Sequence, residues 1–207
     1  NEVIPEGATA ENNYTVNGVT YDNKIVNVKV TVTYNKETGE LKAKLAEDSE
    51  AIAFQNSYDT ETSIGLEGSK SLSGRDLTAG EFNFQVKEND KVVATGSNDA
   101  TGKISFSKIS YKLSDLKKAD GTYESEKTYE YTVNEVIPEG ATAENNYTVN
   151  GVTYDNKTVN VKVTVTYNKE TGELKAKLAE DSEAIAFQNS YDTETSIGLE
   201  GSKSLSG

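Results

Sequence analysis

Three polar side chains, those of Lys70, Glu135 and Asn189, occupy positions where the alternation of the sequence places apolar residues. Alternate residues of a strand share a face, so Asn189 points to the same side as Phe187 in the run 184–191. Burial favours a neutral lysine and a protonated glutamic acid. A neutral amine can attack a carboxamide carbon while a carboxylic acid polarises it and moves protons. We therefore expect an isopeptide bond between Lys70 and Asn189, formed with loss of ammonia and with Glu135 as the catalytic acid.

Each of these residues also has an ordinary explanation. An Asn in a terminal strand commonly forms a turn or an edge hydrogen bond, and a Glu at a strand end or a Lys before a Leu is commonly solvated. The coincidence of the three favours the reactive interpretation. Glu130 and Glu139 lie near Glu135 in the sequence, but the strand period places Glu130 on the opposite face.

The elements that must position these residues are strands. Alternation of apolar and polar residues, with turn residues between short runs, predicts an all-β fold, an Ig-like β-sandwich. The polar stretch 113–127 contains either one short helix or only a loop. The expected strands cover 82–86, 92–94, 104–106, 109–111, 129–135, 159–167, 174–178 and 184–191.

A tandem repeat of about 133 residues sets the domain organisation, because residues 1–74 recur as residues 134–207 with the single difference of Ile25 against Thr158. Three parts follow from this offset. Residues 1–60 form the C-terminal part of a first repeat, residues 61–192 form a complete repeat, and residues 193–207 form a linker and the start of a third. In the partial repeats the equivalents of the three candidate residues are Glu2, Asn56 and Lys203.

Composition excludes several classes of function. The chain has no His, Cys, Met or Trp, which removes disulfides, thiolate and imidazole metal sites, and catalytic triads. A net charge of −13 opposes binding to nucleic acid, and no stretch predicts membrane insertion. The pairs Asn98-Asp99 and Asp155-Asn156 lack the spaced carboxylates of a calcium loop, so we expect turns there, no metal site and no cofactor.

Four stretches together resemble the pilin isopeptide linkage domain of streptococcal major pilins and of large Gram-positive surface adhesins. They are KSLSGRDLTAGEFNF at 70–84, YEYTVNE at 129–135, GVTYD at 151–155 and FQNSY at 187–191. The resemblance spans the complete repeat and, in truncated form, both flanks. It implies that Lys70 and Asn189 are the bond-forming residues and that Glu135 is the catalytic acid.

The expected function is that of a structural stalk or adhesin repeat in a bacterial cell-surface fibre, extracellular and part of a cell-wall-anchored protein. Neighbouring repeats are expected to lie end to end, and the only chemistry is a single-turnover self-cross-link, so the protein is not expected to be an enzyme. An alternative is a module that binds a host surface protein or glycan. Hydrolysis by the pair Glu180-Asp181 is disfavoured, because adjacent strand residues face opposite ways.

The partial repeats raise one further hypothesis. Residues 1–60 keep Glu2 and Asn56 but contain no equivalent of Lys70, whereas Lys203 has no Asn after it. Under this hypothesis neighbouring chains complete one another, and Lys203 of one chain supplies the missing lysine to Asn56 of the next chain. Such completion is partial, because the tail contains no equivalent of the strand at 82–86.

Overall fold

The computed structural model describes residues 1–194 and 196–205. The chain divides into two compact units, Asn1–Thr60 and Glu61–Gly207, and each is described by itself. No helix in the described part of the chain has the length and apolar character needed to cross a membrane.

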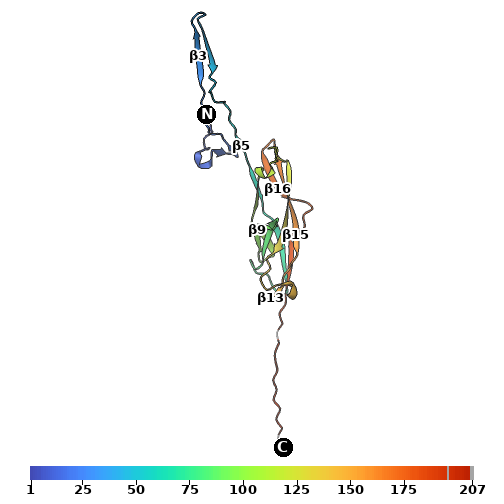
Figure 1. The fold of residues 1–207 in the computed structure, drawn as a ribbon. Helices are drawn as coiled ribbons and strands as arrows, with labels where there is room; N and C mark the ends of the chain where they lie inside the picture. Colours follow the sequence, from blue (N-terminus) through green and yellow to red (C-terminus); the bar gives the residue numbers. More distant parts are fainter. Residues whose placement is uncertain (195, 206–207) are drawn as a thin grey trace. The chain divides into compact units, whose positions relative to one another are not determined.

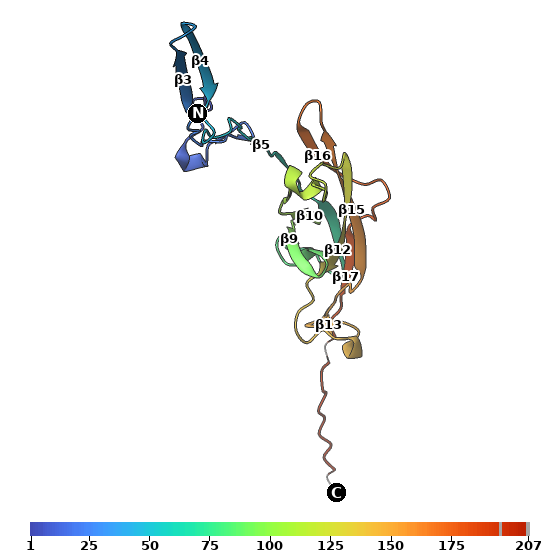
Figure 2. The same cartoon turned by 45° about the horizontal axis from the view of Figure 1, so that its top comes forward.

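The second unit is built on a ten-stranded sheet with the order β13-β14-β17-β7-β10-β9-β8-β12-β15-β16 (Figures 1 and 2). A two-stranded sheet of β6 and β11 accompanies it. The strands are β6 (Glu61–Ile64), β7 (Glu67–Ser73), β8 (Asn83–Glu88), β9 (Lys91–Asn98), β10 (Lys103–Phe106), β11 (Ile109–Lys112), β12 (Glu126–Glu135), β13 (Thr148–Val149), β14 (Val152–Thr153), β15 (Thr158–Asn168), β16 (Glu173–Leu178) and β17 (Ala186–Tyr191). Short 3-10 helices lie at η2 (Leu113–Leu116) and η3 (Ala143–Asn145).

The large sheet curls into two layers around one core. Phe187 of β17 and Phe84 of β8 are separated by three strands in the hydrogen-bonding order, yet their ring centroids lie 5.1 Å apart. Phe84 is fully buried, as are Val133 of β12 and Val163 of β15, so the inner faces of the two layers pack on each other. The predicted all-β sandwich is therefore confirmed, with the two layers joined through β9 and β10.

Turn chemistry sets the hairpins. Asn89 and Asp90 have φ of 47° and 65°, the positive values that a two-residue hairpin turn requires between β8 and β9. Asn150 and Gly151 play the same part between β13 and β14. The stretch 113–127, for which the sequence left a short helix or a loop open, contains the single turn η2 and then irregular chain before β12 begins at Glu126.

The first unit contains a three-stranded sheet, order β1-β2-β5, and a separate hairpin of β3 and β4. Its elements are η1 (Ala10–Asn12), β1 (Thr15–Val16), β2 (Val19–Thr20), β3 (Val30–Asn35), β4 (Glu40–Leu45) and β5 (Ser57–Tyr58). Every residue of β3 and β4 is exposed, although the equivalent strands β15 and β16 belong to the ten-stranded sheet.

Candidate isopeptide site

Lys70 lies in the middle of β7, between β17 and β10. Strand β7 pairs in parallel with β17, with Lys70 beside Phe187, and its antiparallel partner on the other side is β10. The Lys70 N–H donates to the carbonyl oxygen of Gly102 at 2.7 Å. This backbone pairing fixes the strand so that the Lys70 side chain points inward, where it is completely buried.

Glu135 ends β12 on the facing layer, where it pairs with Phe84 of β8. Its side chain is also completely buried, whereas Glu130 on the same strand is exposed, as the strand period predicts. Glu139 is exposed as well. Of the three neighbouring glutamates, the structure therefore places only Glu135 inside the core.

The carboxyl group of Glu135 bridges the other two candidates. Glu135 Oε2 accepts a hydrogen bond from Lys70 Nζ at 2.7 Å, and Glu135 Oε1 accepts one from Asn189 Nδ2 at 2.7 Å. The residue Asn189 is 2% exposed and lies on β17, next to the strand that carries Lys70. Residues that are far apart in the sequence thus form one buried hydrogen-bonded network.

A fourth group, the backbone N–H of Asp155, completes the site. It donates to Asn189 Oδ1 at 2.8 Å, while the Gln188 N–H donates to Asp155 Oδ2 at 3.0 Å. This N–H requires an oxygen as its acceptor, so it sets the orientation of the Asn189 carboxamide. Asp155 was not among the site residues predicted from the sequence, where its only signal is its place in one of the four family-like stretches.

Aromatic rings enclose the amine. The Lys70 Nζ lies 4.5 Å from the ring centroid of Phe82 and 5.8 Å from that of Phe84. Burial among such groups lowers the pKa of Lys70 below its ordinary value, against the opposing effect of the Glu135 carboxylate. Burial likewise raises the pKa of Glu135, although Lys70 and Asn189 oppose the shift. Both shifts favour the neutral forms.

This arrangement contains every group that amide transfer needs. Transfer of one proton from Lys70 Nζ to Glu135 Oε2 leaves a nucleophilic amine beside a carboxylic acid. Attack on Asn189 Cγ develops negative charge on Oδ1, which the Asp155 N–H is positioned to stabilise. Glu135, whose Oε1 accepts a hydrogen bond from Nδ2, can donate a proton to this nitrogen, which then leaves as ammonia.

The partial repeats contain parts of the same site. In the first unit Asn56 Nδ2 donates to Glu2 Oε1 at 2.6 Å, and the Asp22 N–H donates to Asn56 Oδ1 at 2.9 Å. Lys203 is exposed, in the segment 196–205, which has no regular secondary structure. The carboxyl and carboxamide halves of the site therefore recur in the first unit.

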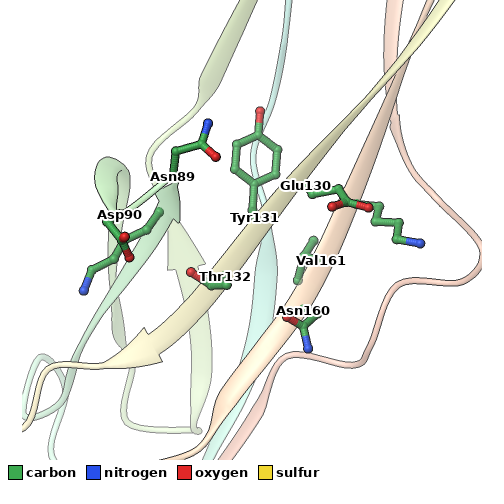
Figure 3. A pocket seen from close by; sticks show the side chains of 9 residues that line it. Asn89, Asp90, Glu130, Tyr131, Thr132, Asn160 and Val161 are labelled. Carbon is green, nitrogen blue, oxygen red and sulfur yellow. The ribbon is translucent and has the colours of Figure 1, made fainter.

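An open groove with a volume of about 450 Å³ lies elsewhere on the second unit, at the turn between β8 and β9 and along β12 and β15. It is lined by Lys87, Asn89, Asp90, Glu130, Tyr131, Thr132, Asn160, Val161 and Lys162. Figure 3 shows its labelled side chains, with Asn89 and Asp90 at the turn between β8 and β9 and with Glu130 and Thr132 on β12. The groove shares no lining residue with the Lys70–Glu135–Asn189 network.

Comparison with known proteins identifies the family of the chain. The family model FctA, described as a Spy0128-like isopeptide containing domain, matches residues 5–59 and 66–192. The chain therefore belongs to this family, through both of its units. No match was found among curated proteins.

Among solved structures, the chain is similar to the major pilin of Streptococcus pyogenes, with 19% identity, a TM-score of 0.34 and coverage of 62% of this chain and 50% of the pilin. It is also similar to the major pilin protein T-13 of the same species, with 19% identity, a TM-score of 0.33 and coverage of 64% and 54%. The chain thus spans about half the length of the solved pilins it matches.

Proposed function

We propose that the second unit is a load-bearing module of a Gram-positive cell-surface fibre, of the pilus-shaft or stalk type, locked by a Lys70–Asn189 isopeptide bond. The observation that carries this proposal is the completely buried Lys70–Glu135–Asn189 network. A buried ion pair is in general weak support for stability, because desolvation offsets the attraction. A reactive role explains why the core holds these three polar groups together.

The position of the bond gives it a mechanical purpose. Along the sequence, β7 with Lys70 is the first strand of the large sheet and β17 with Asn189 is the last. Within the sheet these two strands are neighbours. Force that enters before Lys70 and leaves after Asn189 passes through the bond, and the chain between them carries no load. No oxidant is needed, which suits an extracellular protein without cysteine.

Intact mass spectrometry tests the bond. The wild-type mass is expected to fall short of the sequence mass by one ammonia, and Lys70→Ala and Glu135→Ala should each restore the full mass. Matched controls are Lys103→Ala and Glu130→Ala, because both residues are exposed and Glu130 lies on the same strand as Glu135. A wild-type mass equal to the sequence mass overturns the proposal.

The alternative function is recognition of a host protein or glycan. The groove beside β12 supports it, since it presents charged side chains of both signs, Lys162 and Glu130 among them. Saturable binding of the chain to a glycan array or a host protein, abolished by Lys162→Ala, supports this alternative. Retention of binding in the Lys162→Ala variant contradicts a role for the groove. The near-identity of the repeats fits a spacer better than a specialised binding tip.

A further inference from the structure

The backbone pairing of β14 with β17 stops just before the isopeptide site. Its antiparallel register, continued in both directions, places Gly151 opposite Asp192 and Asp155 opposite Gln188. The first of these pairs is hydrogen-bonded, because the Asp192 N–H donates to the Gly151 carbonyl oxygen at 2.9 Å. Bonded pairs recur at every second residue of an antiparallel ladder. A regular ladder would therefore commit the Asp155 N–H to the carbonyl oxygen of Gln188.

Side chains replace both backbone bonds of that pair. The Gln188 N–H donates to Asp155 Oδ2 at 3.0 Å, so the Asp155 carboxylate accepts the bond that its own carbonyl oxygen would accept in a ladder. The Asp155 N–H donates to Asn189 Oδ1 at 2.8 Å instead of to Gln188. The exchange ends the ladder and leaves one N–H for the oxygen on which negative charge develops during attack on Asn189.

The carboxylate of Asp155 is itself held in place by Lys157. The Lys157 N–H donates to Asp155 Oδ1 at 3.3 Å, and Lys157 Nζ lies 2.9 Å from Asp155 Oδ2. Burial opposes ionisation, but the Gln188 N–H and Lys157 together hold the pKa of Asp155 below its ordinary value. A turn formed by an Asp side chain with the backbone two residues on explains Oδ1 alone. The bond from Gln188 to Oδ2 joins the link 154–157 to β17 and needs a second reason.

The first unit repeats this arrangement in different surroundings. The Asp22 N–H donates to Asn56 Oδ1 at 2.9 Å, and the Gln55 N–H donates to Asp22 Oδ2 at 3.0 Å. Lys24 Nζ lies 2.9 Å from Asp22 Oδ2. In the described residues of this unit the sheet consists of β1, β2 and β5, without an equivalent of β7. The exchange of hydrogen bonds therefore does not depend on the strand that carries the lysine.

We propose that the Asp155 carboxylate is a positioning group for isopeptide formation: by accepting the Gln188 N–H, it keeps the Asp155 N–H out of the ladder and directed at Asn189 Oδ1. The inference rests on the proposed function, because it assigns a role in the same reaction. Lys70 Nζ attacks Asn189 Cγ, and the Cγ–Nδ2 bond breaks. Glu135 passes the proton lost by Nζ to the departing nitrogen, and one ammonia leaves. Asp155 exchanges no proton in these steps.

The benefit of this arrangement is a donor that is already oriented before the reaction. A hydrogen-bond donor fixed where charge develops stabilises the tetrahedral intermediate without reorganisation. Without the carboxylate, the Gln188 N–H loses its acceptor, and the ladder bond becomes available to the backbone of residue 155. The Asp155 N–H is then free to turn from Asn189 to the carbonyl oxygen of Gln188.

The test follows refolding of the 207-residue chain from the unfolded, unbonded state, with circular dichroism reporting the sheet and intact mass reporting the loss of one ammonia. Asp155→Ala should regain its sheet at the wild-type rate but lose ammonia about 100-fold more slowly, because the donor is displaced. Asp155→Asn keeps an oxygen acceptor for Gln188 and should recover most of that rate. Asp181→Asn removes an exposed carboxylate that also pairs with a lysine, and as the matched control it should change neither signal.

The two signals separate positioning from a purely structural role, which would delay the sheet and the mass change together. Such a joint delay overturns the proposal, and so does wild-type bond formation in Asp155→Ala or an Asp155→Asn chain that is as slow as Asp155→Ala. If Asp155→Ala does not refold, Asp155→Glu is the second variant. It moves the carboxylate by one methylene and should show the same lag of mass behind sheet, whereas wild-type kinetics in this variant overturn the proposal.

The wild-type chain distinguishes this inference from the proposed function. A wild-type chain that refolds and keeps its full mass overturns the proposed function, and the role of Asp155 with it. A wild-type chain that loses one ammonia, with Asp155→Ala losing it at the same rate, overturns the role of Asp155 alone.

Discussion

The segments 1–60 and 134–193 have the same sequence except at Ile25 and Thr158, yet they are buried to very different extents. Val30 is 59% exposed and its equivalent Val163 is fully buried, and Leu41 is 68% exposed against 5% for Leu174. In the second unit β12 pairs with β15 from Glu126 to Asn134, whereas the first unit contains only the equivalents of the last two residues of β12, Asn1 and Glu2. An amphipathic hairpin forms by itself, but its core face is covered only when neighbouring strands are supplied.

The two copies agree at the site itself. The Glu–Asn and backbone–Asn hydrogen bonds are the same in both, and the difference is the lysine that β7 adds to one of them. Sixty residues are therefore enough to assemble the electrophile and the acid. The nucleophile depends on β7, which lies at the start of the complete repeat.

The largest expected effect comes from removing the bond in the second unit. Lys70→Met replaces the amine with an apolar side chain, and it should decrease the free energy of unfolding by about 4 to 5 kcal/mol, the loop-entropy value for a link between residues 70 and 189. Chemical denaturation followed by circular dichroism measures it, with Lys103→Met as the exposed control. An unchanged midpoint for Lys70→Met contradicts a stabilising cross-link.

The next largest effect on the free energy of unfolding should come from truncating one of two equivalent leucines. Leu174→Ala should destabilise the second unit by about 2 to 5 kcal/mol because it leaves a cavity in a packed core. Leu41→Ala removes an exposed side chain and should change the unfolding of either unit by less than about 0.5 kcal/mol. Denaturant titration of both variants measures this contrast, and equal effects would show that the hairpin of the first unit is also covered in solution.

The rate of bond formation should depend on pH in a bell-shaped manner. Burial raises the pKa of Glu135 and lowers the pKa of Lys70. Only at a pH between these two shifted pKa values does the pair hold a single proton, which can then lie on Glu135 while Lys70 is neutral. Below the raised pKa of Glu135 the lysine stays an ammonium, and above the lowered pKa of Lys70 the acid is missing; the rate should fall about tenfold per pH unit on each side.

Refolding of chain recovered unfolded from inclusion bodies, sampled by intact mass over a pH series, measures this profile. The window should be narrower than the interval between the ordinary values of 4.5 and 10.5. A rate that rises steadily through the ordinary pKa of lysine would show that Glu135 is not needed as an acid.

The smallest effect should be equal in the two copies. Gly7 and Gly140 have φ of 96° and 98° in matching Pro-Glu-Gly turns, and a Cβ built on either meets only a valine Cγ2 at 3.9 Å, so Gly7→Ala and Gly140→Ala should each cost locally about 1 kcal/mol. Hydrogen exchange at Ala8 and Ala141, whose N–H groups donate to the carbonyl oxygens of Pro5 and Pro138 in these turns, measures the change. A clear inequality would mean that tertiary packing, rather than turn chemistry, holds one of the turns.

Local sequence predicted most of the strands and the inward side of each. The alternation around Val163 and around Asn189 placed both on a buried face, and the structure agrees. The parallel pairing of β7 with β17 could not be predicted from the sequence, because nothing in either strand specifies a neighbour more than a hundred residues away. The role of the Asp155 N–H was missed for the same reason, since any residue type supplies that group.

By itself, the sequence determined the hairpins, the turns and the identity of three polar residues that break the apolar pattern. The register of β3 with β4 matches that of β15 with β16, from Val30 opposite Leu45 to the equivalent Val163 opposite Leu178, although the surroundings differ. Tertiary structure alone decided which copy buries its strands and which site receives a lysine. The physical reason is that turn geometry and alternation act over a few residues, whereas burial and the shift of a pKa require strands from distant parts of the chain.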